Sequence, residues 1–551
     1  MVSEKRGKVV FLLASAVLAV TSLCFIYVVY RNPGVRVCAS ADIPPTSTNV
    51  HTDLVELYPV PNVNSKTVHY FWCARKMFEF HNYLSILSVV KMVKPLKIVF
   101  HYTDYPVLDP LEYNSWFRDL VATIPYLVLD EMSTDTSCRN SAKDKLHTVQ
   151  QYLLQHGGLY VGENTVFRQF PTQAKQMQLL FSFRTANKNE KIIKNEYLDK
   201  CLDGFIGVVP GTNATTVNES LTFSHSDMRA CSMYDYEVSV ERCLAVTVNL
   251  PVRPKDIWYI DINFGKLARL LFYGKSDVIH LQQDFKVLAP RISHYIWFGK
   301  RTLTYAHYLS VLSALYVARL YHVYFHGDCE PLGEFWETLK REENVTFVFM
   351  ELPEFVFGNV VQNKAHANDV VKLYILNKYG GVNQDPDVLW TKPIEDSHLA
   401  YDSVMGFEWV KADGWPETFN IGVFIAKKHS KFVHEFLLTM KDYRDKHWIY
   451  NSGCLPYRVY ERFPHVLHAD RQLQVLCYKH KCHPPWFKDY NEYYMNDDAL
   501  YFFIEWNVET LSVHLTFPKP YPEYTSQATL MASTGMYASI GRNILKKAGK
   551  I

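Results

Sequence analysis

Two aspartates, Asp385 and Asp387, follow the double glycine Gly380-Gly381 in the stretch YGGVNQDPDVLW, with one residue between them. In an extended strand, side chains two residues apart lie on the same face, so we expect the two carboxylates to be neighbours. Such crowding is unfavourable unless a cation lies between the carboxylates or one of them stays protonated. Hard divalent ions prefer carboxylate oxygens, and Mg²⁺ or Mn²⁺ commonly bridges to phosphates. The pattern predicts a metal clamp for a diphosphate, with a solvated Asp-Pro-Asp turn as the alternative.

The segments around this pair alternate between strand-like and helix-like patterns. HYIWF, YHVYFH and VTFVFMEL are apolar or β-branched, and segments of helical length separate them. The run NDVVKLYILNKYGG predicts a helix that begins at Asn368 or Asp369 and ends at the glycines, which would also permit a tight turn and the close approach of a ligand. We therefore expect an α/β fold with a mostly parallel sheet and a ligand site beyond the carboxyl ends of its strands.

The chain also repeats itself. Four pairs of short segments match in the same order, the first three at an offset of 225 residues and the last at 223: HYFW at 69–72 with HYIW at 294–297, YLSILS at 83–88 with YLSVLS at 308–313, VFH at 99–101 with YFH at 324–326, and HGG at 156–158 with YGG at 379–381. This period is too long for a solenoid repeat. We predict two diverged copies of one domain, at 66–288 and 289–551.

The first copy lacks the paired aspartates. At the offset of 223, residues 385–387 fall on residues 162–164, where Glu163 is the one acidic residue. A single displaced carboxylate is a poor clamp for a metal diphosphate. We expect the first copy to be degenerate and retained for packing, dimer contact or acceptor binding.

The stretch HANDVVKLYILNKYGGVNQDPDV resembles the DxD signature of retaining GT-A glycosyltransferases of family 32, the group with Golgi α-1,4-galactosyl- and α-1,4-N-acetylglucosaminyltransferases and the yeast initiating α-1,6-mannosyltransferase. Residues from RISHYIWFG to DVLWTKPIE carry the resemblance. It implies two tandem GT-A-like domains, retention of anomeric configuration, Mn²⁺ or Mg²⁺, a nucleotide-sugar donor (UDP-linked rather than GDP-linked) and a glycan, glycolipid or glycoprotein acceptor.

The resemblance also implies a role for individual residues. Those expected at the metal are Asp387, Asp385 (on the metal or the ribose) and His514 in LSVHLTF, for which a structural histidine is the alternative. Those expected at the donor are Asp369 on the sugar hydroxyls, Lys372 facing the phosphates, Trp297 stacked on the nucleobase, and Asn420, Gly380 and Gly381 near the site. Asp369 and Asp387 are the expected catalytic residues.

Three residues depart from the family pattern. Asn383 and Gln384 replace the usual Tyr-Leu before the DxD, which places polar groups where a buried strand favours apolar ones. Lys372 replaces an arginine, so the charge is kept while the bidentate fork is lost. The departures indicate either an altered donor or a site in decay.

The N-terminal region predicts membrane attachment. Val9 to Tyr30 is an uncharged run of 22 residues, long enough for a transmembrane helix, which needs about 20. With basic residues before it, we expect a signal anchor with residues 1–8 cytoplasmic, a stem at 31–65 and the remainder in the Golgi lumen. A cleaved signal, with ASA at 39–41 as the cleavage site, is the alternative.

Two features agree with a lumenal location. Asn213, Asn218 and Asn344 begin glycosylation sequons. Ten of the eleven cysteines follow the apolar run, where disulfides can form. A zinc site on Cys477 and Cys482, together with His480 and His483, is the less favoured interpretation of those residues.

Composition limits the function classes. Charged residues are 21% and the formal charge is +2, which gives no reason to expect a nucleic-acid partner. The leading function is a Golgi glycosyltransferase, with a homodimer among the expected assemblies. A membrane-anchored pseudoenzyme or glycan-binding scaffold is the second. A glycosidase is disfavoured, because adjacent carboxylates on one face do not reach opposite sides of a sugar.

Overall fold

The computed structural model describes residues 67–109, 111–133, 141–156, 158–170, 205–208, 229–408, 415–478, 481–483, 505–515 and 525–551. The predicted tail, transmembrane segment and stem, and the sequons at Asn213 and Asn218, lie outside these residues. Within them, no helix is long and apolar enough to cross a membrane. Asn344 is partly exposed in the turn before a strand. Cys73 and Cys243 each take part in a disulfide bond, as expected for some of the cysteines.

The first half of the chain forms a five-stranded sheet in the order β3-β2-β1-β4-β6, in which all neighbours are parallel except β4 and β6. Its elements are β1 (Thr67–Trp72), α2 (Phe80–Ser88), β2 (Lys97–Tyr102), α3 (Trp116–Thr123), β3 (Leu127–Glu131), α4 (Ala142–His156), β4 (Gly158–Val161) and β6 (Phe205–Val208). A small sheet, β5 (Thr165–Phe167), β8 (Cys243–Thr247) and β7 (Arg229–Ser232), and the helices α7 (Met233–Val238) and α8 (Asn263–Tyr273) complete this half.

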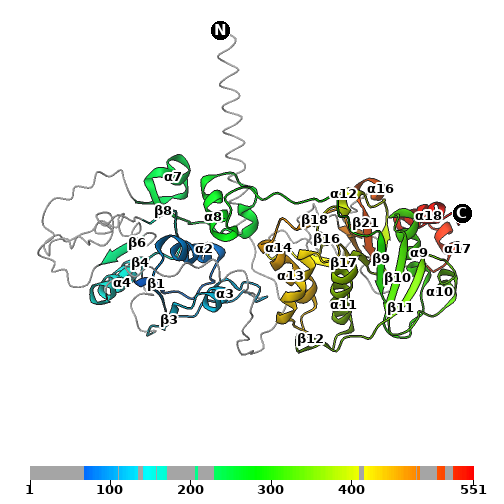
Figure 1. Ribbon diagram of the computed structural model, residues 1–551, viewed down its shortest axis with the longest axis horizontal. Coiled ribbons are helices and arrows are strands. Elements are labelled where there is room, and N and C mark those ends of the chain that lie inside the picture. The colour runs from blue at the N-terminus through cyan, green and yellow to red at the C-terminus, as the bar shows by residue number, and fades with distance from the viewer. Residues whose placement is uncertain are drawn as a thin grey trace, which may run out of the picture.

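The second half lies beside the first (Figure 1) and forms a seven-stranded sheet in the order β11-β10-β9-β14-β17-β16-β18. Its strands are β9 (Ile292–Ile296), β10 (His322–Gly327), β11 (Val345–Phe349), β14 (Gly381–Gln384), β16 (Ser403–Phe407), β17 (Phe419–Ala426) and β18 (Leu467–Ala469). The strands from β11 to β14 are parallel, β17 is antiparallel to both neighbours, and β18 is parallel to β16. The predicted α/β fold with a mostly parallel sheet is confirmed.

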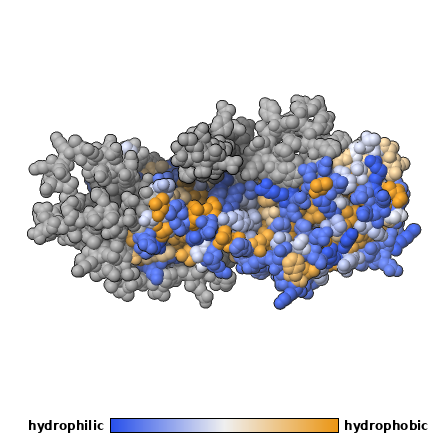
Figure 2. Space-filling view, turned by 90° about the horizontal axis from the view of Figure 1, so that it is seen from above, coloured by the Kyte–Doolittle hydropathy of each residue, from blue (hydrophilic) through white to orange (hydrophobic). Residues whose placement is uncertain are grey.

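Helices cover both faces of this sheet. They are α9 (Tyr305–Leu312), α10 (Glu334–Leu339), α11 (Lys364–Tyr379), α12 (Asp396–Leu399), α13 (Lys431–Thr439), α14 (Leu455–Arg462), α16 (Trp506–Glu509), α17 (Gln527–Ala532) and α18 (Met536–Lys547). Alternation along β9 builds the layers: Tyr295 packs into the cluster that contains α9 and α18, whereas Ile296 packs against α11. On the face shown in Figure 2, hydrophobic residues are scattered among hydrophilic ones, as is usual for a surface in contact with water.

A second, four-stranded sheet and a short hairpin complete this half. The sheet has the order β15-β21-β19-β20, and the hairpin is formed by β12 and β13. Their bounds are β15 (Val388–Trp390), β21 (Ser512–Leu515), β19 (Val475–Tyr478), β20 (Lys481–His483), β12 (Phe355–Val356) and β13 (Asn359–Val360).

The helix before the aspartates begins earlier than expected. The Asn363 side chain accepts a hydrogen bond from the backbone N–H of Ala365 at 3.0 Å and caps α11, so Asn368 and Asp369 lie inside the helix. The prediction that the helix begins at Asn368 or Asp369 is wrong because another cap residue stands five positions upstream of Asn368. An internal aspartate is tolerated here because Lys372, one turn later, pairs with it.

The two sheets share internal contacts as well as strand order. Ser85 Oγ donates to the carbonyl of Thr165 at 2.6 Å, and Ser310 Oγ donates to the carbonyl of Val388 at 2.6 Å. Each sheet also buries a histidine pair with a ring nitrogen distance of 3.0 Å: His69 with His101, and His294 with His326. These matched contacts lie 225 or 223 residues apart in sequence, as do the repeated segments.

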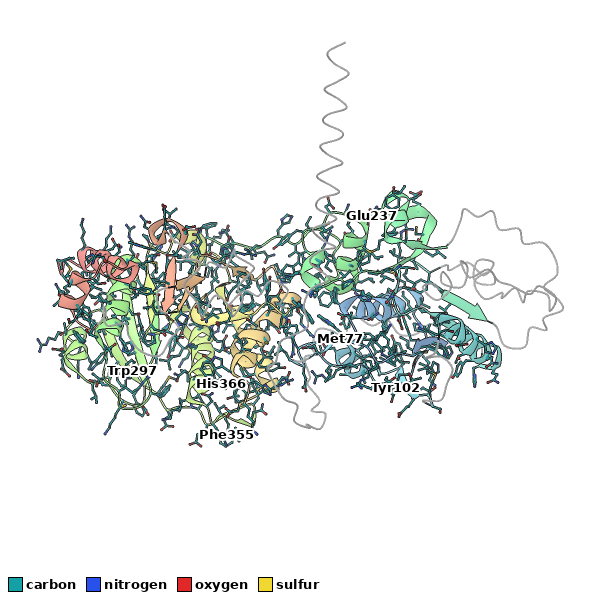
Figure 3. The ribbon with its side chains drawn as sticks, turned by 180° about the vertical axis from the view of Figure 1, so that it is seen from behind. Met77, Tyr102, Glu237, Trp297, Phe355 and His366 are labelled. Atoms are coloured by element: carbon teal, nitrogen blue, oxygen red, sulfur yellow. The ribbon has the colours of Figure 1, made fainter. Side chains whose placement is uncertain are left out.

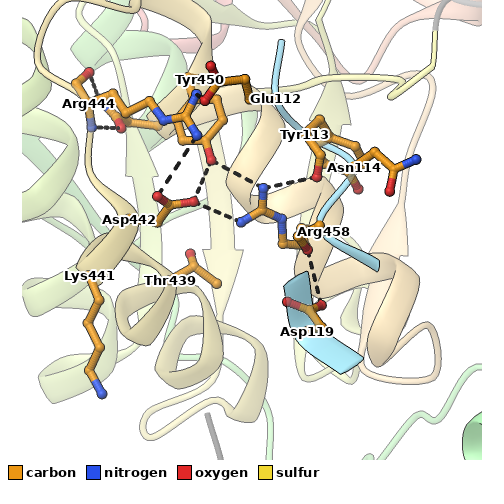
Figure 4. A network of polar contacts seen from close by, with 12 residues as sticks. Glu112, Tyr113, Asn114, Asp119, Thr439, Lys441, Asp442, Arg444, Tyr450 and Arg458 are labelled. Atoms are coloured by element: carbon orange, nitrogen blue, oxygen red, sulfur yellow. Dashed lines mark hydrogen bonds and ion pairs between the residues drawn. The ribbon is translucent and has the colours of Figure 1, made fainter. Parts of the chain in front are cut away.

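A polar network joins the two halves (Figure 4). The Arg458 guanidinium donates to Asp442 at 3.1 Å, to the Tyr450 hydroxyl at 3.1 Å and, in the first half, to the carbonyl of Tyr113 at 3.1 Å. Arg462 forms an ion pair with Asp119 of α3. Burial opposes the charge on Arg458, but its anionic and phenolic neighbours outweigh burial and raise its pKa above the ordinary value.

Glu461 lies at the centre of this interface and is completely buried. Its carboxyl group accepts hydrogen bonds from the Tyr113 hydroxyl at 2.5 Å and from the Trp415 indole at 2.9 Å. Burial raises the pKa of Glu461 from 4.5 to about 7, although these bonds and the nearby Lys255 and Arg253 act in the opposite direction.

Glu461→Gln will flatten the dependence of stability on pH. Because Glu461 holds its proton more tightly in the folded protein, its stabilising contribution is full below pH 4.5 and is lost as pH rises through about 7, a change of about 3 kcal/mol. Glutamine stays uncharged, so the melting temperature of the variant will fall less than that of the natural protein between about pH 5 and about pH 8. Glu343→Gln on the exposed turn before β11 is the control, and equal slopes for all three proteins would contradict the assignment.

Candidate functional site

Asp385 and Asp387 lie in a turn that joins two different sheets. The backbone N–H of Val388 donates to the carbonyl of Asp385 at 3.1 Å, which closes a β-turn with Pro386 at its second position. The prediction that both aspartates lie on one face of a strand is therefore wrong. Strand β14 ends at Gln384, and the proline, which has no N–H for a strand ladder, separates it from β15.

The turn brings three potential metal ligands together. Strand β15 pairs with β21 so that Val388 stands opposite His514, and the backbone N–H of Leu515 donates to the carbonyl of Asp387 at 3.1 Å. As a result, one ligand atom from each of Asp385, Asp387 and His514 lies within 4.8 Å of the other two. The structure thus places all three residues predicted at the metal in one cluster, although His514 is 127 residues from Asp387 in sequence.

His514 and Asp387 form an ion pair, with 3.2 Å between Nε2 and Oδ1. Burial lowers the pKa of His514, but Asp387, Asp385 and Glu408 together outweigh burial and the net change is upward. The pKa of Asp387 changes in the opposite direction: burial raises it, and the His514 partner lowers it below the ordinary value. The other ring nitrogen of His514, Nδ1, is buried with no hydrogen-bond partner among the described residues.

Lys372 joins the helix to the aspartate turn. Its ammonium group lies 2.8 Å from Asp385 and 3.2 Å from Asp369, and only 4% of its side chain is exposed. The two carboxylates outweigh burial and raise the pKa of Lys372 above its ordinary value. The prediction that Lys372 faces the phosphates is not supported, because the ammonium group points into the protein and is engaged by two carboxylates.

Asp369 is also buried, and burial raises its pKa while Lys372 opposes the change. Its carboxylate lies on the same face of α11 as Lys372 and is held next to the aspartate turn through that ammonium group. This position is compatible with the predicted contact to a donor-sugar hydroxyl.

The charge balance of the cluster favours a divalent cation. Asp385, Asp387 and Asp369 face the positive groups of Lys372 and His514, and Glu408, directly after β16, also acts on His514. Four carboxylates thus surround one lysine and one histidine. The excess negative charge, the orphaned His514 Nδ1 and the oxygen-rich donor set together fit Mn²⁺ or Mg²⁺.

Asn420 lies next to this cluster and is bonded on both sides. Its amide nitrogen donates to Glu408 at 2.5 Å, and its amide oxygen accepts from the backbone N–H of Gly422 at 2.6 Å. Glu408 was not among the residues expected at the site. Two strands and a helix separate it from Asp387 in sequence, which removes any local sequence signal for it.

Trp297 is 1% exposed, and the Arg301 guanidinium covers its ring at 4.3 Å. His307 meets the ring at its edge, at 5.3 Å between centroids. The prediction that Trp297 stacks on a nucleobase is not supported by this packing, because a base would have to displace Arg301 (Figure 3 shows the position of Trp297). His307 was not among the residues expected here. It lies directly before the repeated segment YLSVLS, and this repetition is the sequence signal that could have indicated it.

Gly380 and Gly381 lie at the far end of β14 from the aspartate turn. A Cβ atom on Gly380 would lie 2.5 Å from the backbone nitrogen of Lys428, and one on Gly381 would lie 2.9 Å from the carbonyl oxygen of Ile292. Both glycines have positive φ, 67° and 102°. In this structure they let the end of α11 pack closely against the sheet, and their contact with a donor stays a prediction.

The two polar departures in β14 are both buried. Gln384 is bonded at both amide atoms: its amide oxygen accepts from Ser293 Oγ and the Trp390 indole, and its amide nitrogen donates to Ser310 Oγ. Asn383, on the opposite face, has no partner for either amide atom among the described residues. Gln384 is therefore an ordinary buried polar group, and nothing in the structure explains Asn383.

The turn of the first half that corresponds to the aspartate turn has one carboxylate, and lysines pair with it. The Glu163 carboxylate pairs with Lys145 at 3.3 Å and with Lys76, whose ammonium group also lies 4.5 Å above the Trp72 ring. These two cations outweigh burial and lower the pKa of Glu163. Within the described residues, His, Cys, Asp and Glu side chains form a cluster with metal-site spacing at Asp385, Asp387 and His514, and none in this half.

Comparison with known proteins agrees with the location of this site. Residues 317–405, which include both aspartates, match the family described as glycosyltransferase sugar-binding region containing DXD motif. The chain is 26% identical over 216 residues to glucan organizing enzyme 1 of Cryptococcus neoformans var. grubii, an alignment that covers 37% of this chain and 56% of the relative. The chain therefore carries a glycosyltransferase sugar-binding region and spans little more than half of its curated relative.

Solved glycosyltransferase structures are also similar. The galactosyltransferase LgtC, in complex with donor and acceptor sugar analogs, is 15% identical, with 47% of this chain and 96% of that chain covered and a TM-score of 0.28. The PaToxG glycosyltransferase is 16% identical, with 32% and 70% covered and a TM-score of 0.25.

Gly422→Ala will weaken metal binding without removing a ligand. A Cβ atom there would lie 2.4 Å from Cε1 of His514, so the imidazole must move. We expect the affinity for Mn²⁺, measured by calorimetric titration, to fall roughly tenfold or more. Gly541→Ala on α18 is the control, since its Cβ would meet Leu530 at 2.6 Å, away from the site. Unchanged Mn²⁺ affinity in Gly422→Ala would exclude His514 as a ligand.

Proposed function

We propose that this protein is a metal-dependent retaining glycosyltransferase that transfers a sugar from a nucleotide sugar, UDP-linked rather than GDP-linked, to a glycan, glycolipid or glycoprotein. The observation that carries the proposal is the cluster that Asp385 and Asp387, on one turn of the sugar-binding region, form with His514 of β21. Retention of configuration rests on the resemblance to family 32 alone.

The cluster would hold the cation, and the bound ion would supply Lewis-acid stabilisation of the charge that develops on the leaving diphosphate. The chain's own residues do the positioning. Lys372 fixes Asp369 and Asp385 relative to each other, and Asn420 fixes Glu408 beside His514. Asp369 accepts a hydroxyl group of the donor sugar, which orients the anomeric carbon before transfer.

The shared strand order and matched hydrogen bonds support a tandem duplication, with the boundaries proposed from the sequence. In this proposal the first copy is a degenerate domain whose Glu163 pairs with lysines and holds no metal. Its role in dimer contact stays a prediction.

We also propose a Golgi type II membrane protein with its catalytic region in the lumen. The apolar run at 9–30, the sequons and the disulfide-bonded Cys73 and Cys243 support this location. Because the fungal relative is named a glucan organizing enzyme, a glucan is one of the acceptors to test.

Two other functions make different predictions. A pseudoenzyme or glycan-binding scaffold would bind glycans without releasing nucleotide from any donor. A glycosidase would need no metal and would place two carboxyl groups on opposite sides of a sugar. In this structure Asp385 and Asp387 flank one proline in a single turn, which disfavours a glycosidase.

The experiment offers the protein a panel of UDP- and GDP-sugars with and without Mn²⁺ and follows nucleotide release. We expect release from one donor, dependent on Mn²⁺ and reduced at least a hundredfold by Asp387→Asn, because one metal-binding oxygen is lost; losses of this order follow removal of one electrostatic contact to a transition state.

The duplication offers a matched control. Glu163→Gln changes the corresponding turn of the first copy, and it should leave nucleotide release unchanged. Absence of release and of donor binding across the whole panel would refute the transferase. Equal losses in Asp387→Asn and Glu163→Gln would refute the assignment of the two copies.

A further inference from the structure

Three side chains form a row along α11 that leads away from the metal cluster. His366, Asp369 and Lys372 are spaced three residues apart and lie on one face of the helix, with a rise of about 4.5 Å per step. Lys372 contacts Asp385 at the inner end of the row. His366 is at the outer end, in the first turn of the helix (Figure 3).

An exposed tryptophan stands over the outer end of this row. Trp448, in the segment between α13 and α14, is 68% exposed, and its ring centroid lies 5.7 Å from that of His366, with 39° between the ring planes. An indole face is suited to stacking on the C–H face of a pyranose ring, since it joins a broad apolar surface to a polar edge.

The imidazole beneath Trp448 has an unused hydrogen-bonding atom. His366 is 2% exposed, and the Tyr443 hydroxyl lies 3.4 Å from its Nδ1. That hydroxyl donates its proton to Asp445 at 2.5 Å, so its oxygen is the acceptor and His366 carries its proton on Nδ1. Nε2 is therefore an acceptor, and it is buried without a partner in the described part of the chain. A buried unpaired acceptor is costly, and a hydroxyl donor would satisfy it.

Backbone contacts fix this segment relative to the helix. Asp445 Oδ1 accepts hydrogen bonds from the backbone N–H groups of Gln362 at 3.0 Å and Asn363 at 3.1 Å, at the start of α11. The Asn359 side chain, on the adjoining hairpin, donates to the carbonyl of Lys441 at 3.2 Å. The place of Trp448 next to the row is therefore set by the fold around it.

From these contacts we propose that Trp448 and His366 form an acceptor subsite that takes the pyranose ring of a glycan. The ring stacks on Trp448, and one of its hydroxyl groups donates to Nε2 of His366. The site lies one helical turn beyond Asp369, which holds the donor sugar in the proposed function, so the ring bound here belongs to the molecule that receives that sugar. Asp369 and Asp445 make the surroundings acidic, which suits an uncharged sugar better than a phosphate.

That the bound sugar is an acceptor rests on the proposed function, and the experiment tests the sugar site separately from that function. Methyl glycosides of galactose, glucose, mannose and N-acetylglucosamine are offered to the full chain at millimolar concentration, and saturation transfer to their ring protons is measured by NMR. We expect transfer for at least one glycoside, a loss of roughly tenfold or more in Trp448→Ala, and partial retention in Trp448→Phe, which keeps an aromatic face. Tyr321→Ala removes another exposed aromatic residue and is the control.

UDP binding with Mn²⁺ is measured on the same proteins and should be unchanged in Trp448→Ala. Absence of UDP binding in every protein, with glycoside binding that still depends on Trp448, would refute the transferase and leave the sugar site standing. Equal saturation transfer in Trp448→Ala and the natural protein, or none with any glycoside, would overturn the subsite. Loss of UDP binding together with glycoside binding in Trp448→Ala would also overturn it, because Trp448 would then support the donor site.

Discussion

The buried Lys372 ammonium group is the interaction on which the site depends. It sits between Asp369 of α11 and Asp385 of the aspartate turn and is almost shielded from water. A buried charge of this kind is tolerated only when it is paired, so removing Lys372 would leave Asp369 and Asp385 without their shared cation. The pairing fixes α11 against the end of β14. A second pair, Asp387 with His514, fixes the other side of the turn to β21. The turn is thus held from two sheets at once.

The first half of the chain shows what happens when this charge pattern changes. Its strands have the same order and its serine and histidine contacts are the same, so the framework does not depend on the charges. At the turn, however, one carboxylate faces two lysines, whereas in the second half two aspartates share one lysine. In the first half, the lysines neutralise the carboxylate of Glu163. In the second half, the aspartates keep an excess of negative charge that can bind a cation. The framework and the metal site are therefore separable properties of this fold.

The sequence predicted the parts that depend on local spacing and on repetition. The α/β alternation and the proximity of the two aspartates follow from patterns within a few residues, and His514 was placed through the family resemblance. What the sequence did not predict depends on packing. Gly380 and Gly381 allow close helix packing, because they lie at the opposite end of β14 from the aspartates. The ring of Trp297 is covered by Arg301. Contacts between residues more than 300 positions apart, such as Tyr113 with Glu461, leave no local pattern in either segment.

Those long-range contacts tie the first half of the chain to the site in the second half. Glu461, bonded to Tyr113 of the first half, also accepts from Trp415, which precedes β17. Strand β17 then carries Asn420, whose amide holds Glu408 and the backbone of Gly422, and Gly422 leaves the space that His514 occupies. A continuous set of hydrogen bonds and backbone therefore runs from the first half to His514 in the second. A half whose described residues contain no metal-site cluster still has a structural reason to remain, because it supports the strand that shapes the site.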